Sequence, residues 1–420
     1  MALAVTYPAP RPLAVAAERD FAVDMIKGFA CLLMVIAHVP FPHAPWLQIG
    51  TEGAVLFFAS TGMNLWHIAA RDRGDELRIA ANGLFLIFAG FANNYVNGTL
   101  GQADVFQSAG MAMLAMLVLR WMLPRFWTWL FPLPYLIHFL NAHVYYWKTS
   151  AGGVSSFFLS PGLFPLLPWL SFYLLGAHLK RYPRRRMRLG VALLALLALG
   201  AVVATRGFVF DKFWMSADYW LLGVAYATLL LDLFRYWIAH RPRARSKQNQ
   251  HRYGPAGQTA CGFDPRKSRT LPLGAGYTDA DFALGKPAPW KELRYWGANS
   301  LVFYILQTLV IRVLEIWLPQ GLGLLMASLV LTALLLRAGL WLQRWAKRQN
   351  AWPVLAGCAV LSAGTLALQA WVFHGYFIRS YSSFVLTLAF VAAYPAFKNL
   401  SARLPRRYAP ANGLTASTLP

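Results

Sequence analysis

Residues 21–46 read FAVDMIKGFACLLMVIAHVPFPHAPW, and this stretch decides the fold class of the chain. A helix needs about 20 predominantly apolar residues to cross the hydrocarbon of a bilayer, and residues 21–40 meet that length. Lys27 and His38 are eleven residues apart, so about 16 Å of helix separates them. Ionisable side chains are costly in hydrocarbon. We therefore predict a membrane-spanning helix that carries a cation toward one side and an imidazole toward the other.

The composition extends this prediction to the whole chain. Of its 420 residues, 58% are hydrophobic and 13% are charged, whereas a soluble domain has roughly 25% charged residues. The 39 Lys and Arg residues exceed the 16 Asp and Glu residues, which gives a net charge of +23. These cations occur in short runs between apolar stretches, unlike the clustered basic face that binds nucleic acid. We expect an all-α, polytopic transmembrane helical bundle in the lipid bilayer of the inner (cytoplasmic) membrane, with no nucleic-acid partner.

About twelve stretches have the length and the flanking charges of membrane spans. The weakest is 126–146, because Pro132 and Pro134 interrupt it, so ten or eleven crossings stay open as alternatives. The twelve stretches are 21–40, 51–69, 78–96, 105–123, 126–146, 162–179, 189–206, 218–239, 296–317, 322–340, 353–373 and 382–398.

Cations are abundant at every second exit from these stretches and sparse at the others. The positive-inside rule then predicts that both chain termini are cytoplasmic. Segment 240–294 is basic, rich in Gly, Pro, Gln and Ser, and without helical periodicity, so we interpret it as a flexible cytoplasmic loop. The loop separates two parts of a transmembrane core, and a tail lies at each end: 1–20, 21–239, 240–294, 295–398 and 399–420.

Asp24, Lys27, Gly28, Ala30 and His38 form a pattern that resembles the first helix of the transmembrane acyltransferase superfamily. This superfamily includes acyltransferase-3 proteins and heparan-alpha-glucosaminide N-acetyltransferase-like proteins. Four further stretches are similar to elements of the superfamily. They are HAPW at 43–46, EGAVLFFASTGM at 52–63, FPLLPWLSFYLLG at 164–176 and NSLVFYILQ at 299–307.

The resemblance implies transfer of an acyl group, most often acetyl, from cytoplasmic acyl-CoA to a sugar or glycan on the far side. Acyl-CoA would be a co-substrate, with no permanently bound cofactor. The implied catalytic residues are His38, His43 and Glu52. The implied contacts to CoA are Asp24, Lys27, Arg71 and Arg73. The implied contacts to the acceptor are Trp46, His138, Asn141, Trp169, Asn299, Tyr304 and Gln307.

Two positions depart from the family pattern. The chain has Lys27 where the family usually has Arg, and lysine contacts a phosphate as a point charge rather than through two parallel hydrogen bonds. The chain has Gln307 where histidine is common, which argues against acid/base chemistry at that position.

The residues themselves favour histidine chemistry without fixing the mechanism. Histidine titrates near neutral pH, so His38 or His43 suits either removal of a proton from the acceptor or transient attachment of the acyl group. Glu52 suits either the acceptor or the N-terminus of its own helix. His138, Asn141 and His143 lack a carboxylate or a third imidazole, so we predict no metal site there.

Other polar residues inside the spans have structural interpretations. Asp232 and Arg235 stand three residues apart, as do Arg312 and Glu315, and each pair is expected to neutralise itself. Asp24 and Lys27 have the same spacing. Three uncharged residues are expected to form hydrogen bonds between helices: Asn93, Asn94 and Gln107.

Two alternatives to an enzyme remain open at this stage. A twelve-span secondary transporter suits the number of spans, the cytoplasmic termini and the long central loop. Transporters usually break helices and place charges in both halves of the chain, whereas the best candidates here cluster on the first two spans and their connection. A non-catalytic glycan-binding membrane protein is the third candidate, favoured if Gln307 marks lost chemistry. Homo-oligomerisation also stays open.

Overall fold

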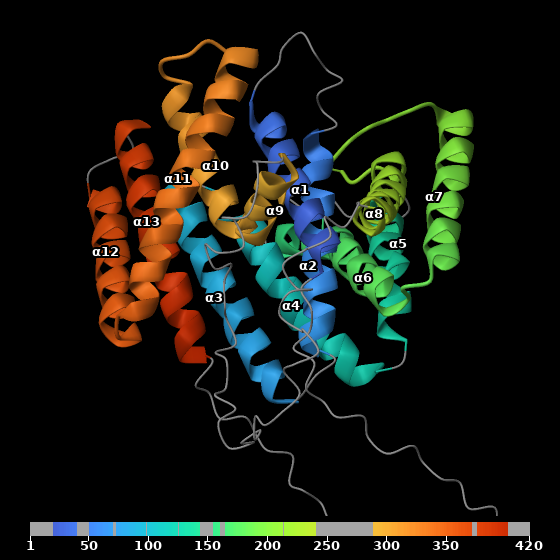
Figure 1. Ribbon diagram of the computed structural model, residues 1–420, viewed down its shortest axis with the longest axis horizontal. Helices are drawn as coiled ribbons and strands as arrows, with labels where there is room; N and C mark the ends of the chain where they lie inside the picture. Colours follow the sequence, from blue (N-terminus) through green and yellow to red (C-terminus); the bar gives the residue numbers. More distant parts are fainter. Residues whose placement is uncertain are drawn as a thin grey trace, which may run out of the picture.

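The computed structural model describes residues 20–39, 50–69, 73–97, 99–124, 126–142, 154–159, 164–212, 214–240, 289–371 and 376–401. These residues form helices and no β-strand, as the sequence predicts (Figure 1). The α-helices are α1 Phe21–His38, α2 Glu52–Ala69, α3 Arg73–Asn97, α4 Val105–Met122, α5 Pro132–Leu140, α6 Leu166–Arg181, α7 Arg185–Arg206, α8 Ala217–Ala239, α9 Pro289–Ala298, α10 Ser300–Leu314, α11 Leu322–Arg348, α12 Ala351–Trp371 and α13 Tyr376–Ser401. Two short 3-10 helices, η2 (Trp127–Leu130) and η4 (Val154–Phe157), join them.

Seven of the described helices are long and apolar enough to cross a membrane, and the bent pair α9 and α10 brings the number up to eight. The outermost ones expose apolar side chains that a soluble protein would bury. On α7, Leu194 and Leu197 are 69% and 62% exposed, and α12 likewise presents Val360 and Leu361. Exposed apolar surface of this extent fits a lipid environment. The chain is therefore a multi-pass membrane protein.

The centre of the bundle is formed by α1, α2 and α6, and α2 packs against both of the others. The α2–α6 contact is close because Gly62 and Gly176 lie at the crossing. A Cβ at Gly62 would overlap the carbonyl oxygen of Tyr173, and one at Gly176 would overlap that of Ala59. Small residues let helix backbones approach in this way, and van der Waals packing then holds the helices together in lipid.

A second close contact joins segments far apart in the chain. Gly28 of α1 faces the backbone of Leu293, and Gly297 of α9 faces the backbone of Asp24. The short α9 therefore lies against the first half of α1, which Figure 1 shows near the middle of the molecule. The chain then turns by 92° into α10 at Asn299.

Three predictions of local structure were wrong. Residues 126–146 do not form one span, because the described part consists of η2 and the nine-residue α5, which has prolines in its first turn. Stretch 296–317 is bent where one straight span was expected. The predicted loop 240–294 is helical from Pro289 onward, and its residues 241–288 lie outside the described residues.

The predicted polar contacts within the helices are confirmed in one case and wrong in another. Asn94 donates to the side chain of Gln107 over 2.9 Å, and Asn93 donates to Asp104 over 2.7 Å, so α3 and the start of α4 are joined by hydrogen bonds. Asp232 does not pair with the nearby Arg235. Both residues instead bind partners on other elements, because helix packing brings opposite charges closer than the i, i+3 spacing does.

Candidate functional site

A pocket lies at the His38 end of α1, between the starts of α2 and α4, the segment before α8, and α10. It has about 340 Å³ of empty space, part of it open to solvent. Its walls are mostly apolar and aromatic. The described lining residues are Met34, Ala37, His38, Gly50, Thr51, Ala54, Phe57, Phe58, Val105, Phe164, Lys212 and Tyr304. Ligand sites commonly combine such walls with a few polar groups that orient the ligand.

His38 is exposed at the last position of α1. Its Nδ1 lies 2.6 Å from the carbonyl oxygen of Met34, one turn earlier in the helix. A carbonyl oxygen only accepts hydrogen bonds, so Nδ1 carries the proton in the neutral ring, and Nε2 has the lone pair. The hydrogen bond thus fixes the tautomer and leaves Nε2 as the basic atom.

Among the described residues, Tyr304 is the other predicted site residue that lines the pocket. Its ring lies 6.5 Å from the His38 ring in an edge-to-face arrangement, and it also contacts Phe57 and Phe106. The structure thus brings together two predicted residues separated by 266 positions (304 − 38). Aromatic rings arranged in this way provide an apolar surface with a hydroxyl at its edge.

Trp169 is fully buried and supports the pocket from behind. Its ring lies 4.9 Å from Phe58 and 5.0 Å from Phe164, both of which line the pocket. Trp169 was predicted to touch the acceptor. In the structure it contacts the rings of the wall, so it acts as a positioning residue for that wall.

Glu52 is fully buried in the first turn of α2 and is absent from the described pocket lining. Among the described residues, neither carboxyl oxygen has a hydrogen-bond partner. Glu52 acts electrostatically on Tyr219 of α8, whose hydroxyl donates to the carbonyl oxygen of the neighbouring Thr51. Glu52 is therefore buried in the packing next to the lining residue Thr51 and outside the described pocket lining.

The predicted acceptor residues on α9 and α10 are also placed differently. Asn299 stands at the bend between these helices, and its side chain donates to the carbonyl oxygen of Tyr295 over 2.9 Å. Gln307 is fully buried, and neither polar atom of its amide has a hydrogen-bond partner in the part of the chain that the structure describes. Neither residue is among the described residues that line the pocket.

His138 and Asn141 lie on and just beyond α5, away from the described pocket lining. His138 is buried, and its Nε2 lies 3.0 Å from the carbonyl oxygen of Trp214. This contact joins α5 to the segment before α8. His43 and Trp46, predicted on the connection after α1, lie outside the described residues, as does His143.

Two of the residues predicted to bind CoA, Asp24 and Lys27, lie toward the opposite end of α1. Asp24 is buried and Lys27 is half-buried, and α9 packs against this part of the helix. Arg71 lies outside the described residues, and Arg73 begins α3 without a described side chain. Within the described part of the chain, none of these residues lines the pocket at His38.

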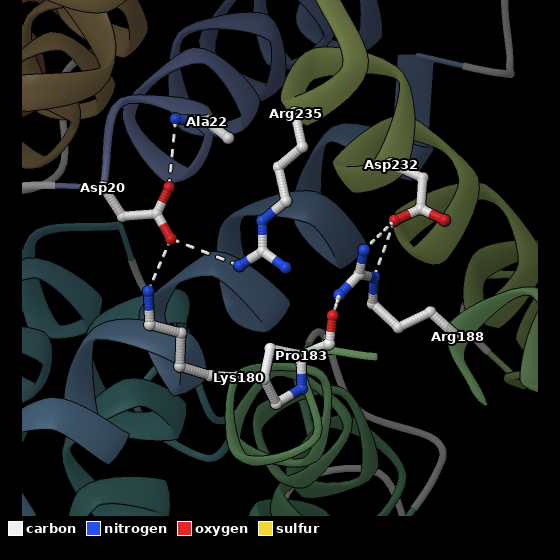
Figure 2. Close-up of polar contacts among 7 residues, drawn as sticks. All are labelled: Asp20, Ala22, Lys180, Pro183, Arg188, Asp232 and Arg235. Carbon is white, nitrogen blue, oxygen red and sulfur yellow. Dashed lines mark hydrogen bonds and ion pairs between the residues drawn. The ribbon is translucent and has the colours of Figure 1, made fainter. Parts of the chain in front are cut away.

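Two ion-pair groups occupy the Asp20 end of α1 (Figure 2). Asp20 accepts from Lys180 over 2.5 Å and from Arg235 over 3.3 Å, while its other oxygen caps α1. Arg188 donates from Nε to Asp232 over 2.6 Å and also binds the carbonyl oxygen of Pro183. Burial alone would raise the pKa of Asp20, but the hydrogen bond and charge of Lys180, with the charge of Arg235, hold it below its usual value.

Lys212 was not predicted as a site residue, although it lines the pocket together with His38. Its ammonium lies 4.6 Å from the centre of the Phe164 ring. Burial lowers the pKa of Lys212 to about 8. The sequence contained a signal for it, because Lys212 is one of few cations on the connections that the positive-inside rule keeps poor in charge.

No model of a known family, no curated protein and no solved structure matches this chain.

Proposed function

We propose that the chain is a multi-pass membrane enzyme that transfers an acyl group, most often acetyl, from cytoplasmic acyl-CoA to an extracytoplasmic sugar or glycan. The observation that carries the proposal is the pocket in which His38 has a fixed tautomer beside the aromatic walls of Tyr304 and Phe57. The sequence motifs support the reaction class, and the pocket supports an acceptor site next to a base.

In the proposed reaction, His38 Nε2 takes the proton from an acceptor hydroxyl or amine. The freed oxygen or nitrogen attacks the thioester carbonyl carbon, the carbon–sulfur bond breaks, and CoA leaves as a thiolate that takes up a proton. A positioned base of this kind contributes about 10²- to 10⁴-fold to the rate. The hydroxyl of Tyr304 and the walls of Phe57 would orient the sugar.

The proposed orientation follows the distribution of charge. Both termini and the Asp20 end of α1 face the cytoplasm, an even number of segments crosses the inner membrane, and the pocket opens on the far side. Lys180, Arg188 and Arg235, which gather at the Asp20 end, fit this orientation. The acyl group must then reach the pocket along α1 from donor contacts that include Lys27.

The decisive experiment supplies purified protein in liposomes with radiolabelled acetyl-CoA and a total glycan extract. We expect label in glycan with the parent protein and a loss of at least 100-fold with His38→Ala. The matched control is His240→Ala, because His240 is exposed and makes the same contact, Nδ1 to the carbonyl oxygen four residues earlier, outside the pocket. Absence of both transfer and CoA release from the parent protein overturns the enzyme proposal.

The same experiment separates the two routes for the acyl group. Direct transfer leaves the protein unlabelled when the acceptor is omitted. An acyl-histidine intermediate leaves label on the protein under these conditions, and His38→Ala removes that label. Peptide mass spectrometry after acid quenching locates the labelled residue.

A secondary transporter is the second candidate, and two observations favour it. The α9–α10 pair bends by 92°, and Glu52 is a buried carboxyl with no hydrogen-bond partner among the described residues; both features are common in transporter sites. Uptake of a labelled sugar into the liposomes without acyl-CoA, combined with no CoA release, would support transport. Sugar binding without either activity would support a non-catalytic glycan-binding protein.

A further inference from the structure

One face of α7 begins with an arginine that is neutralised inside the protein. Arg188 is buried, and the buried Ala192 and Ala195 follow it at helical spacing, so this face is the one that packs against α8. Arg188 binds Asp232 of α8 and the carbonyl oxygen of Pro183, as Figure 2 shows. The charge on the packed face of α7 therefore has its partners within the bundle.

Three other arginines lie just before Arg188, and their surroundings are different. Arg184, Arg185 and Arg186, which we call the arginine patch, are exposed at the start of α7. Among the described residues, none of these three side chains takes part in an ion pair or a hydrogen bond. The first turn of α7 has no acidic residue, so the helix does not balance these charges either. The patch is thus a site of uncompensated positive charge.

Arg186 stands at the head of an apolar stripe that faces away from α8. Leu189, Leu193 and Leu197 follow it at spacings of three, four and four residues, which places the four side chains on one face of the helix. All three leucines are exposed, and we call them the leucine stripe. Figure 1 shows α7 at the edge of the molecule, and α7 has the length and composition of a membrane span. The leucine stripe therefore faces lipid.

The length of the leucine stripe matches one leaflet of a bilayer. Eleven residues separate Arg186 from Leu197, so about 16 Å of helix lies between them. The hydrocarbon core of a bilayer is about 30 Å thick, and each leaflet contributes about half of it. When the leucines contact the acyl chains of one leaflet, the arginine patch lies at the level of the headgroups. The positive-inside rule makes this leaflet cytoplasmic in the proposed orientation.

We propose that the arginine patch and the leucine stripe together bind an anionic phospholipid. The headgroup phosphate contacts the arginines, and an acyl chain lies along the leucines. Guanidinium groups suit this role because they bind phosphate through parallel, charge-assisted hydrogen bonds. Cations next to a membrane span are attracted by anionic headgroups in the same way. The inference uses only the surface of α7 and does not depend on acyl transfer.

A second copy of this chain fits the same surface less well. Two copies that met along the leucine stripe about a two-fold axis normal to the membrane would have parallel α7 helices. Their arginine patches would then lie at the same level, where like charges repel each other. A lipid phosphate supplies the opposite charge instead, so charge complementarity favours the lipid.

Lipid binding to the purified full-length protein in detergent can be counted by native mass spectrometry. Dioleoyl phosphatidylglycerol and dioleoyl phosphatidylcholine have the same acyl chains and differ in net charge, so their comparison isolates the headgroup. We expect the first phosphatidylglycerol to bind at a concentration about tenfold or more below that of phosphatidylcholine, and we expect salt to reduce this preference. Equal binding of the two lipids overturns the proposal.

Variants locate the bound lipid. Arg186→Gln should weaken phosphatidylglycerol binding about fivefold, the double variant Arg185→Gln with Arg186→Gln about 25-fold, and Arg186→Lys should keep most of the affinity. The matched control is Arg337→Gln, because Arg337 is equally charged and exposed but already binds Glu292 over 3.2 Å. It should bind phosphatidylglycerol as the parent protein does.

The replaced side chains are exposed, so the unfolding midpoints of these variants should stay close to that of the parent protein. An equal loss of phosphatidylglycerol binding in Arg186→Gln and Arg337→Gln, or no loss in either, overturns the site.

Two further outcomes would assign the surface to another partner. If coenzyme A displaces phosphatidylglycerol from the parent protein, the arginine patch binds a soluble phosphate, and the lipid proposal is wrong. If Leu193→Cys gives a disulfide-linked dimer in membranes and the parent protein does not, a second copy covers the leucine stripe, and the lipid proposal is wrong as well. Displacement by neither coenzyme A nor a second copy supports the lipid.

Discussion

The two ends of α1 differ in what their polar side chains contact: other charged side chains at one end, and a pocket at the other. At the Asp20 end, Lys180 and Arg235 bind one carboxylate, and Arg188 binds Asp232 next to it. At the other end, His38 borders a pocket whose described lining contains no acidic residue. Paired charges at a helix junction hold segments together, whereas a histidine and a lysine that line a pocket are candidates for contact with a ligand. The comparison teaches that a polar residue in this bundle is interpretable only from what packs around it.

The largest expected effect is at the Asp20 end. Arg188→Met leaves the buried Asp232 without its cation and should lower the free energy of unfolding by about 3–5 kcal/mol. The double variant Arg188→Met with Asp232→Leu should recover most of this loss, because no buried charge remains. Unfolding in detergent, followed by tryptophan fluorescence, measures both. A double variant as unstable as the single one contradicts a structural role for the pair.

At the pocket, replacing the charged residue is expected to raise the free energy of unfolding instead of lowering it. Lys212 has a pKa of about 8, below the unfolded value of about 10.4. Between about pH 8 and about pH 10.4 the unfolded chain binds more protons at this residue than the folded protein does. The contribution of Lys212 to the free energy of unfolding therefore rises from about pH 8 to about pH 10.4, and its full destabilising effect is present below about pH 8. Lys212→Met should therefore stabilise the protein at pH 7 by up to about 3 kcal/mol and lack this rise.

The check is the unfolding midpoint of Lys212→Met and of Lys180→Met across pH 7 to 10. Lys180 is the matched lysine at the paired end, and its replacement should destabilise the protein because Asp20 loses a hydrogen bond. If both replacements shift the midpoint in the same direction, the contrast between the two ends is not real.

A smaller effect is expected for Asp20→Asn, at roughly 1.5–3 kcal/mol, because hydrogen bonds with charged groups are lost. The sign of the pH dependence follows from the lowered pKa of Asp20. Its contribution is fully present above the unfolded pKa of about 3.9 and is lost as the pH falls through the lower folded value. The Asp20→Asn variant should lack this loss of stability at acid pH. If stability falls with pH in the same way in the variant and in the parent protein, Asp20 makes no such contribution.

The smallest effect on stability is expected for His38→Ala, within about 0.5 kcal/mol, because the ring is exposed. The same substitution is expected to abolish transfer. Circular dichroism and the unfolding midpoint measure the first, and the liposome assay measures the second. A large loss of stability would mean that His38 serves packing, as Trp169 does.

Much of the fold was predictable from local properties of the sequence. The apolar lengths and the low charge predicted an all-helical membrane protein, and the boundaries of α1 and α12 lie close to the predicted ones. The bend at Asn299 was not predictable in this way, because 296–317 has the length of a single span and contains no proline. The bend instead accompanies the contact between Gly297 and the backbone of α1.

The candidate site was predictable only in part. His38 was found because an imidazole at the end of a span is costly enough to notice. Tyr304 came from the resemblance to a family. Glu52 and Gln307 had equally suggestive positions in the sequence, and the packing buries both outside the described pocket lining. Lys212 had only one signal in the sequence, its position as one of few cations on the connections that the positive-inside rule keeps poor in charge.

The sequence by itself determined that this chain is a bundle of membrane-spanning helices, because the length of an apolar run and the charge of its flanks act locally. Only the tertiary structure decided which polar residues meet. Asp20 binds Lys180 across 160 positions, and His38 shares a pocket with Lys212 and Tyr304, because these encounters depend on how distant helices pack. In this protein that packing separates the paired charges at the Asp20 end of α1 from His38 and Lys212, which line the pocket at its other end.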